Sequence, residues 1–229
     1  MNRLSATHAR NTAKCAPTMT NNSSGRVVWL TGLPASGKTT IANELSRHLL
    51  SRGWKVCVLD GDKLREGLCS DLGFSRADRR ENIRRVCEVA KLFADAGIIC
   101  IVALISPYRS DRELVRHRVS GQQFMEVFVN APVEVCEQRD PKGLYRKARA
   151  NQIKDFTGVS APYEAPLQPA IELRTDKMSV TEAAQKVLTH LCKTIQAPIM
   201  IDSFHQQRDE IIDATFEPDW RRGSESKHR

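Results

Sequence analysis

The sequence lacks long apolar runs and paired cysteines, and no acidic residue precedes Glu44. Because no apolar run approaches the roughly 20 residues that span a bilayer, we expect no transmembrane helix. The seven cysteines are odd in number, scattered, and contain no C-x-x-C pair, so we expect a reducing compartment and no disulfide framework. The six histidines are also scattered, and none is assigned to a metal or to catalysis.

The first 24 residues are basic and free of acids, with Arg3, Arg10 and Lys14 among many Ser, Thr and Asn residues. Such a composition occurs in disordered extensions and in organelle transit peptides. Because this segment is short and poor in apolar residues, we interpret residues 1–24 as a disordered basic extension of a cytoplasmic protein, with organelle targeting as the alternative. Residues 196–229 are interpreted as a partly disordered C-terminal tail.

Between these tails, residues 25–195 have the composition of a globular domain. Charged residues make up 27% and hydrophobic residues 41% of the 229-residue chain, which is enough for one well-buried domain. The formal net charge of +8 indicates an anionic partner. Nucleic acid and small polyanionic substrates both fit such a charge, and the motifs below favour the small substrates.

Strand-like and helix-like segments alternate from residue 26 onward. Residues 98–105 are almost continuously hydrophobic, as expected of a strand covered on both faces. Residues 78–96 carry apolar side chains at helical spacing, and Ser179 with Glu182 has the capping-box pattern of a last helix. The alternation predicts an α/β fold, a three-layer sandwich around a central, mostly parallel sheet. Its strands are expected at residues 27–30, 56–59, 98–105, 125–129 and 171–174.

The loop between the first strand and the first helix carries a specific motif. Residues 32–39 read G-L-P-A-S-G-K-T and match G-x-x-x-x-G-K-[ST] at every fixed position. The glycines let backbone N–H groups surround a phosphate, and the following helix adds its positive end. Lys38 is expected to reach the outer phosphates and the Thr39 hydroxyl to bind Mg²⁺. The motif alone predicts an NTPase or a kinase.

The segment after the second strand contains Asp60, Asp62 and Arg65. Ligands of parallel sheets collect at the carboxyl ends of the strands, so these side chains are expected near the phosphate loop. A carboxylate there can hold a magnesium-bound water or accept the proton of an attacking hydroxyl. We interpret Asp60 as a helix cap and Asp62 as the chemical residue. The alternative is a cap followed by a surface arginine.

Other polar and aromatic residues are expected at the same edge. Ser106 closes the third strand, and we interpret it as a substrate-contacting hydroxyl because no histidine is nearby in sequence to activate it as a nucleophile. Phe74 can stack on a purine, while Arg79 and Asn82, one helical turn apart, can hold phosphate. The alternative for these three residues is a hydrophobic staple at a charged helix start.

Residues 139–165 are rich in Lys and Arg, and Gly143 and Gly158 offer hinges. By itself this pattern is typical of a solvated helix and loop. In a P-loop kinase, the same segment is where a mobile lid closes over phosphates.

Taken in order, these segments resemble the adenylylsulfate kinase (APS kinase) family over about residues 26–195. Other small P-loop kinases share only the first motif. The resemblance rests on Gly32–Thr40, Asp60-Gly-Asp62-x-x-Arg65-x-Gly67-Leu68, Asp71-Leu-Gly-Phe74-Ser75, Asp78-Arg-x-Glu-Asn82-Ile-Arg84-Arg85, Ile105-Ser-Pro-Tyr108-Arg109, Arg139-Asp-Pro-Lys142-Gly-Leu144-Tyr145 and Ile153-Lys-x-Phe156-Thr157-Gly.

The resemblance implies transfer of the ATP γ-phosphoryl group to the 3′-hydroxyl of adenosine 5′-phosphosulfate, with Mg²⁺ as cofactor, giving 3′-phosphoadenosine 5′-phosphosulfate (PAPS). It also implies a homodimer and a functional link to ATP sulfurylase, with no nucleic-acid or membrane partner. Two polyanionic nucleotides then account for the basic charge.

The resemblance also assigns residues to each ligand. Lys38, Asp62 and Ser106 are implied to be catalytic, and Thr39 and Asp62 to bind the metal. The residues implied to bind ATP are Gly32, Ala35, Ser36, Gly37, Lys38, Thr39, Thr40, Arg139 and Met178. Those implied to bind adenylylsulfate are Asp62, Lys63, Leu64, Arg65, Phe74, Arg79, Arg80, Glu81, Asn82, Ile105, Ser106, Lys142, Leu144, Asp155 and Phe156, with its adenine between Phe74 and Phe156.

The family pattern places a phosphoserine at Ser106, although direct in-line transfer needs only positioning and charge neutralisation. Lys63 stands where the family usually has asparagine, and Asn151 replaces a frequent glycine in the lid. Two other functions remain open from the residues alone: a P-loop kinase for a sugar or a shikimate-like acid, and a non-catalytic nucleotide-binding regulator.

Overall fold

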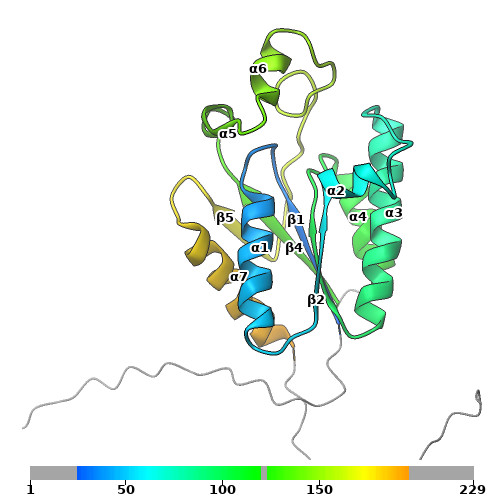
Figure 1. Cartoon of the computed structure of the whole chain (residues 1–229), viewed down its shortest axis with the longest axis vertical. Coiled ribbons are helices and arrows are strands. Elements are labelled where there is room, and N and C mark those ends of the chain that lie inside the picture. Colours follow the sequence, from blue (N-terminus) through cyan, green and yellow to red (C-terminus); the bar gives the residue numbers. More distant parts are fainter. Residues whose placement is uncertain (1–24, 120–122, 196–229) are drawn as a thin grey trace, which may run out of the picture. The chain divides into compact units, whose positions relative to one another are not determined.

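The computed structural model describes residues 25–119 and 123–195, which form a five-stranded sheet with helices on both faces (Figure 1). The elements in chain order are β1 (Arg26–Thr31), α1 (Lys38–Leu50), β2 (Val56–Asp60), α2 (Gly61–Glu66), α3 (Arg76–Asp95), β3 (Ile99–Ala103), α4 (Arg109–Arg118), β4 (Phe124–Asn130), α5 (Val133–Arg139), α6 (Leu144–Arg149), β5 (Ile171–Arg174) and α7 (Val180–Thr194). The strand order is β2-β3-β1-β4-β5, and all four pairings are parallel.

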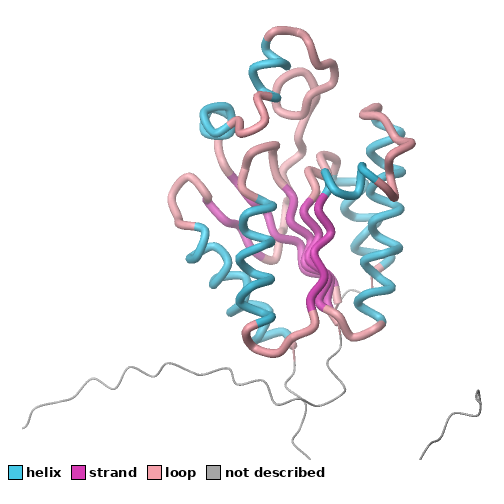
Figure 2. The backbone as a smooth tube through the Cα atoms, viewed as in Figure 1, coloured by secondary structure: helices cyan, strands magenta, loops and turns pink. Residues whose placement is uncertain are grey.

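Alternation along β1 divides the core into two layers. Val28 and Leu30 pack with the apolar faces of α1 and α7, whereas Val27 and Trp29 pack with α3 and with Val115 of α4. Successive strand side chains point to opposite faces, so one fully buried strand contributes to both layers. Figure 2 shows the helices on either side of the sheet. The predicted three-layer sandwich is confirmed.

The predicted strands and helices are found within a few residues of their expected bounds. The main difference is β3, which ends at Ala103 rather than at residue 105. Beyond this end, Ser106 adopts a φ of 40°, outside the strand region. The last helix begins as expected: Ser179 and Glu182 form a complete capping box at the start of α7.

The segment from α5 to β5 lies at the carboxyl end of the sheet, where Figure 1 shows α5 and α6 beyond the strand tips. It has a small core of its own, in which the rings of Tyr145 and Phe156 pack in a T-shaped arrangement with their centroids 5.0 Å apart. Asn151 has a φ of 57°, a left-handed conformation that asparagine tolerates better than most residues other than glycine. That the segment moves as a lid stays a prediction.

The interpretations of residues 1–24 and 196–229 lie outside the described residues. Within the described part, the free thiols include Cys57, Cys69, Cys87, Cys100 and Cys136. None of the helices that the structure describes is long and apolar enough to cross a membrane.

Candidate active site

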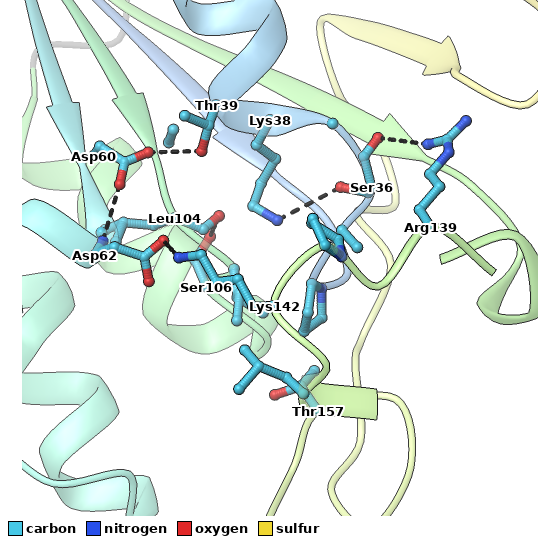
Figure 3. A pocket seen from close by; sticks show the side chains of 18 of the residues that line it. Ser36, Lys38, Thr39, Asp60, Asp62, Leu104, Ser106, Arg139, Lys142 and Thr157 are labelled. Carbon is cyan, nitrogen blue, oxygen red and sulfur yellow. Dashed lines mark hydrogen bonds and ion pairs between the residues drawn. The ribbon is translucent and has the colours of Figure 1, made fainter. Parts of the chain in front are cut away.

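A cavity of about 950 Å³ opens at the carboxyl ends of β1, β2 and β3, between the sheet and the segment containing α5 and α6 (Figure 3). The phosphate loop, the start of α2, the start of α3, the loop after β3 and residues 139–157 all contribute to its walls. Basic side chains outnumber acidic ones in this lining. The basic ones are Lys38, Arg65, Arg79, Arg139, Lys142 and Lys154. The cavity is therefore suited to a polyanionic ligand.

The phosphate loop has the backbone that the motif predicts. A Cβ on Gly32 would lie 2.3 Å from the carbonyl oxygen of Val129, so only glycine fits against β4. Gly37 caps α1 with a φ of 103°, and Ala35 has a φ of 59°. Such left-handed steps turn successive N–H groups toward one point, which makes a nest for an anion at the helix start.

Lys38 is buried within this loop. Its Nζ donates to the carbonyl oxygens of Gly32 at 3.0 Å and Leu33 at 2.7 Å, and it lies 3.5 Å from Ser36 Oγ. Burial lowers the pKa of Lys38 to about 8, opposed by the negative potential of Cys136, Asp60 and Asp62. A bound phosphate supplies a stronger acceptor than a carbonyl, so Lys38 is poised to exchange partners.

Thr39 and Asp60 meet at the mouth of the loop. Thr39 Oγ1 donates to Asp60 Oδ2 at 2.7 Å, while Asp60 Oδ1 caps α2 by accepting from the backbone N–H of Asp62 at 3.0 Å. Hard oxygen donors of this kind fit Mg²⁺, which takes one or two protein oxygens together with substrate phosphates. Among the described residues no cluster of three or more His, Cys, Asp or Glu forms a self-sufficient metal cage. The donor set therefore fits Mg²⁺ held jointly with a nucleotide.

Asp62 faces the lid instead of the phosphate loop. Its Oδ2 forms an ion pair with Lys142 Nζ, from the segment between α5 and α6 (Figure 3). The side chains are 68% and 55% exposed, so both groups are open to the cavity and to solvent. The two carboxylates therefore have different partners: Asp60 contacts Thr39, whereas Asp62 contacts the ammonium group of Lys142. The resemblance implied that Asp62 binds the metal, and that role stays a prediction.

Ser106 lies on the cavity wall with its hydroxyl already engaged. Its Oγ accepts from Trp29 Nε1 at 3.1 Å, and its side chain is buried. The φ of 40° is a strained conformation for a residue other than glycine. No histidine is among the described residues that line the cavity, so no imidazole is in place to activate this hydroxyl.

Phe74 forms an exposed wall together with two arginines. The guanidinium of Arg65 lies 4.3 Å from the centroid of the Phe74 ring, and that of Arg79 lies 5.7 Å from it. Arg79 also donates to the backbone oxygen of Asp155 at 2.8 Å, which links the start of α3 to the lid segment. Phe74 is 58% exposed and lines the cavity, so part of its ring is open to a ligand.

The opposite end of the cavity combines α5 with the loop before α7. Arg139 donates to the backbone oxygen of Thr175 at 2.6 Å and to that of Ser36 at 3.3 Å. Its guanidinium therefore connects α5 and the loop before α7 to the phosphate loop. Met178 lines the cavity nearby, as do Ile105, Leu144 and Thr40 in other parts of the wall.

Several predicted site residues are not brought to the cavity. Gly32, Lys63, Leu64, Arg80 and Glu81 do not line it. On α3 the reason is helical geometry: Arg79 and Asn82 share a face, and the residues between them point elsewhere. Glu81 binds Arg84 and Arg85, and Arg80 lies 3.8 Å from Asp111. The substrate contacts that the family resemblance implies for Arg80 and Glu81 stay predictions.

Sequence reasoning also missed residues. Within the described part of the chain, Asn82 Oδ1 and Thr157 Oγ1 are buried side-chain atoms without a hydrogen-bond partner, and both residues line the cavity. Asn82 was expected there, but Thr157 was expected only as part of a motif. Tyr145 was also missed: it lines the cavity and donates to the Pro34 carbonyl at 3.1 Å. In the sequence, the only indication that Thr157 belongs to the site is its position directly after Phe156.

The geometry defines a class of enzyme. A phosphate loop with buried lysine, a Thr39–Asp60 pair suited to Mg²⁺, and a second carboxylate facing a basic lid form the site of a P-loop phosphotransferase. Comparison with known proteins makes the assignment specific. The family model described as adenylylsulphate kinase matches residues 24–174, so the chain belongs to the adenylylsulfate kinase family.

Individual relatives agree. The adenylyl-sulfate kinase of Marinobacter nauticus is 56% identical over 165 residues, covering 72% of this chain and 83% of the relative. That of Saccharomyces cerevisiae is 56% identical over 169 residues, covering 73% and 84%. Among solved structures, the Mycobacterium tuberculosis APS kinase CysC in complex with AMPPNP and APS is 48% identical, with a TM-score of 0.71 over 73% of this chain and 97% of that one. The chain is thus an ATP-dependent adenylyl-sulfate kinase of sulfate assimilation.

Proposed function

We propose that the cavity holds ATP on the phosphate-loop side and adenosine 5′-phosphosulfate on the side of Asp62, with the ATP γ-phosphoryl group between them. The observation that carries this arrangement is the pair of hydrogen bonds that the Asp60 carboxylate accepts. Asp60 joins Thr39 to the N–H of Asp62, so a metal-binding group and a group facing the lid sit side by side. The related M. tuberculosis structure, in complex with AMPPNP and APS, supports two ligands in one site.

On the ATP side, the backbone N–H groups of the phosphate loop and Lys38 hold the β- and γ-phosphates. Lys38 leaves the carbonyls of Gly32 and Leu33 for this purpose. Thr39 Oγ1 and Asp60 would hold Mg²⁺ together with the nucleotide. When bound, the ion neutralises charge that develops on the phosphate oxygens. Arg139 and Met178 border the remaining part of the nucleotide.

On the acceptor side, Asp62 receives the 3′-hydroxyl and takes its proton as the oxygen bonds to the γ-phosphorus. The bond from that phosphorus to the β-phosphate oxygen breaks, and ADP leaves with the electron pair. Lys142 exchanges Asp62 for the phosphates when the acceptor binds. Phe74 and Phe156 border the acceptor purine, and Arg65 and Arg79 face its phosphosulfate. The unpaired oxygens of Asn82 and Thr157 gain partners from the same ligand.

Ser106 positions the acceptor, and transfer is direct. Its Oγ accepts the Trp29 N–H, and the described cavity lining offers no histidine base, which support a contact role over a phosphoserine intermediate. We also propose a homodimer that is functionally linked to ATP sulfurylase. The cytoplasm is the proposed compartment, which the free thiols of the described residues support.

The experiment is an acceptor panel. The purified chain with ATP and Mg²⁺ is offered adenylylsulfate, gluconate or shikimate, and products are resolved by anion-exchange chromatography. We expect PAPS from adenylylsulfate and no phosphorylated sugar acid. Asp62→Ala should abolish turnover and leave the affinity for a fluorescent ADP analogue nearly unchanged. A phosphorylated sugar acid without PAPS, or equal loss of turnover and nucleotide binding in Asp62→Ala, refutes the assignment.

A further inference from the structure

Arg112 is a buried arginine of α4 that does not line the cavity. Its guanidinium nevertheless contacts Ser106, which lines the cavity, and Glu164, which follows the cavity-lining residues 153–157 in the chain. Its Nη1 donates to the carbonyl oxygen of Ser106 at 2.6 Å, and its Nη2 donates to that of Glu164 at 2.7 Å. Its Nε donates to Glu126 Oε1 at 2.8 Å. One planar group therefore joins β4, the loop after β3 and the chain that returns from the lid to β5.

The ion pair with Glu126 does not by itself explain this residue. Both side chains are almost fully buried, and desolvation cancels much of the attraction in such a pair. Glu126 also accepts from Arg116 Nη2 at 2.7 Å, so its charge has a second partner on the same helix. What Arg112 alone supplies is the two hydrogen bonds to backbone carbonyls.

The Ser106 carbonyl needs such a partner. Ser106 has a φ of 40°, a conformation that costs roughly 1–3 kcal/mol and persists only where neighbours fix it. Trp29 holds its side chain at 3.1 Å, and Thr31 Oγ1 lies 3.4 Å from its carbonyl oxygen. The bond from Arg112 is shorter and charge-assisted, so it is the strongest restraint on this peptide.

The second carbonyl belongs to the base of the lid. Glu164 donates its backbone N–H to the Pro107 carbonyl at 2.8 Å, and its Oε2 accepts from the backbone N–H of Arg109 at 2.8 Å. The guanidinium of Arg112 also lies 5.8 Å from the ring centroid of Tyr163. Figure 1 shows this return segment descending from the lid toward β5. Arg112 thus sits where the Ser106 loop and the returning lid chain meet.

We propose that Arg112 is a positioning residue for the acceptor half of the site. It fixes Ser106 relative to the base of the lid, whose residues Asp155, Phe156 and Thr157 line the cavity a few residues earlier in the chain. Its own hydrogen bonds go to Glu126, Ser106 and Glu164 and to no described residue of the phosphate loop. The proposal rests on the proposed assignment of Ser106 and the lid to the acceptor.

The variant that carries the test is Arg112→Lys, which keeps a charge beside Glu126 but lacks the planar fork that reaches three acceptors. Arg116→Met is the matched control, because it also removes one bond to Glu126 and touches neither Ser106 nor Glu164. The Michaelis constant of each substrate, kcat and thermal unfolding are measured for wild type and both variants with Mg²⁺ present.

We expect Arg112→Lys to lower kcat/KM for adenylylsulfate by roughly 10- to 100-fold, as a small misplacement of a substrate-positioning group does. KM for ATP stays within about twofold. Arg116→Met leaves both substrates near wild type. Equal losses toward ATP and adenylylsulfate, no loss, or an unfolded Arg112→Lys beside a folded Arg116→Met each overturn the proposal. Absence of PAPS from wild type refutes the proposed function itself, so the two failures are distinguishable.

Discussion

Lys142 and Asp62 form an ion pair that joins the lid to the carboxylate proposed to receive the acceptor hydroxyl. Both side chains are more than half exposed, and an exposed pair contributes at most about 1 kcal/mol to stability. We therefore expect its importance to lie in catalysis, as proposed above. In the proposed mechanism, Lys142 keeps a cation close to the reacting groups and moves to a phosphate when substrate displaces it from Asp62.

The first prediction follows from that exposure. Lys142→Met should change the free energy of unfolding by less than about 1 kcal/mol, while kcat should fall by roughly 100-fold because a cation near the migrating phosphoryl group is lost. Chemical denaturation and steady-state kinetics measure the two effects. Lys147→Met, an exposed lysine of α6 outside the cavity lining, is the control and should leave both unchanged. A destabilised Lys142→Met protein with normal turnover contradicts this role.

The second prediction concerns Ser106. Ser106→Ala removes a hydroxyl that contacts Trp29 and, as proposed, the acceptor, so the loss should be near that of one hydrogen bond, about 1 kcal/mol or roughly fivefold in kcat/KM. Turnover must persist, because transfer is direct. Radioactive γ-phosphate from ATP should label no acid-stable phosphoserine in the wild-type protein. Complete inactivity of Ser106→Ala together with a labelled Ser106 supports the covalent route instead.

The third prediction uses a glycine of the lid. Gly158 has a φ of 91°, and a Cβ there would lie 2.9 Å from Cδ2 of Leu33, a residue of the phosphate loop. Gly158→Ala should therefore cost roughly 1–3 kcal/mol in backbone strain and raise the KM of adenylylsulfate. Gly67→Ala is the control, since no atom lies within 4 Å of its Cβ position and its φ is negative. Equal unfolding free energies for the two variants would argue against a fixed lid geometry.

The fourth prediction is a pH dependence of stability at Asp111. Burial raises the pKa of this carboxyl, opposed by Arg80 and Arg76. Folding thus favours the protonated form. The associated stability is present below the ordinary pKa of an aspartate, about 3.9, and is lost as pH rises through the folded-state pKa. Asp111→Asn should accordingly raise the melting temperature at pH 7, and the gain should shrink as pH falls toward 4.

Differential scanning calorimetry across that range measures the effect on Asp111. Arg80→Gln provides a cross-check, because Arg80 lies 3.8 Å from Asp111 and partly offsets its cost. It should destabilise wild type more than it destabilises Asp111→Asn. A gain from Asp111→Asn that is the same at every pH, or a loss at pH 7, contradicts the predicted direction of the pKa shift.

Local patterns were sufficient to predict the fold and the phosphate loop. The loop motif specifies its own backbone, and alternation of apolar segments specifies a parallel sheet whose strand ends converge. The sequence could not show which of two carboxylates two residues apart reaches Thr39. That depends on how α2 begins, and the cap formed by Asp60 decides it. For α3, helical spacing distinguishes Arg79 and Asn82, which line the cavity, from Arg80 and Glu81, whose substrate contacts stay predictions from the family resemblance.

The contacts of Arg112 show a different limit. Its partners Glu126 and Glu164 lie 14 and 52 residues away in the chain, and no motif connects them. Only the packing of α4 against β4 and the returning lid chain brings them to one guanidinium. From the sequence alone, an arginine that becomes buried, such as Arg112, cannot be distinguished from the many arginines that stay exposed.

The division of labour between Asp60 and Asp62 is the central claim, and a Mg²⁺ titration of turnover in Asp60→Asn and Asp62→Asn tests it most directly. Asp60→Asn should raise the Mg²⁺ concentration for half-maximal activity by roughly 10- to 100-fold, as loss of a group that orients a metal ligand does. Asp62→Asn should leave that concentration unchanged and lower kcat by about 10²- to 10⁴-fold. The reverse pattern, with the Mg²⁺ requirement shifted by Asp62→Asn alone, would contradict this division.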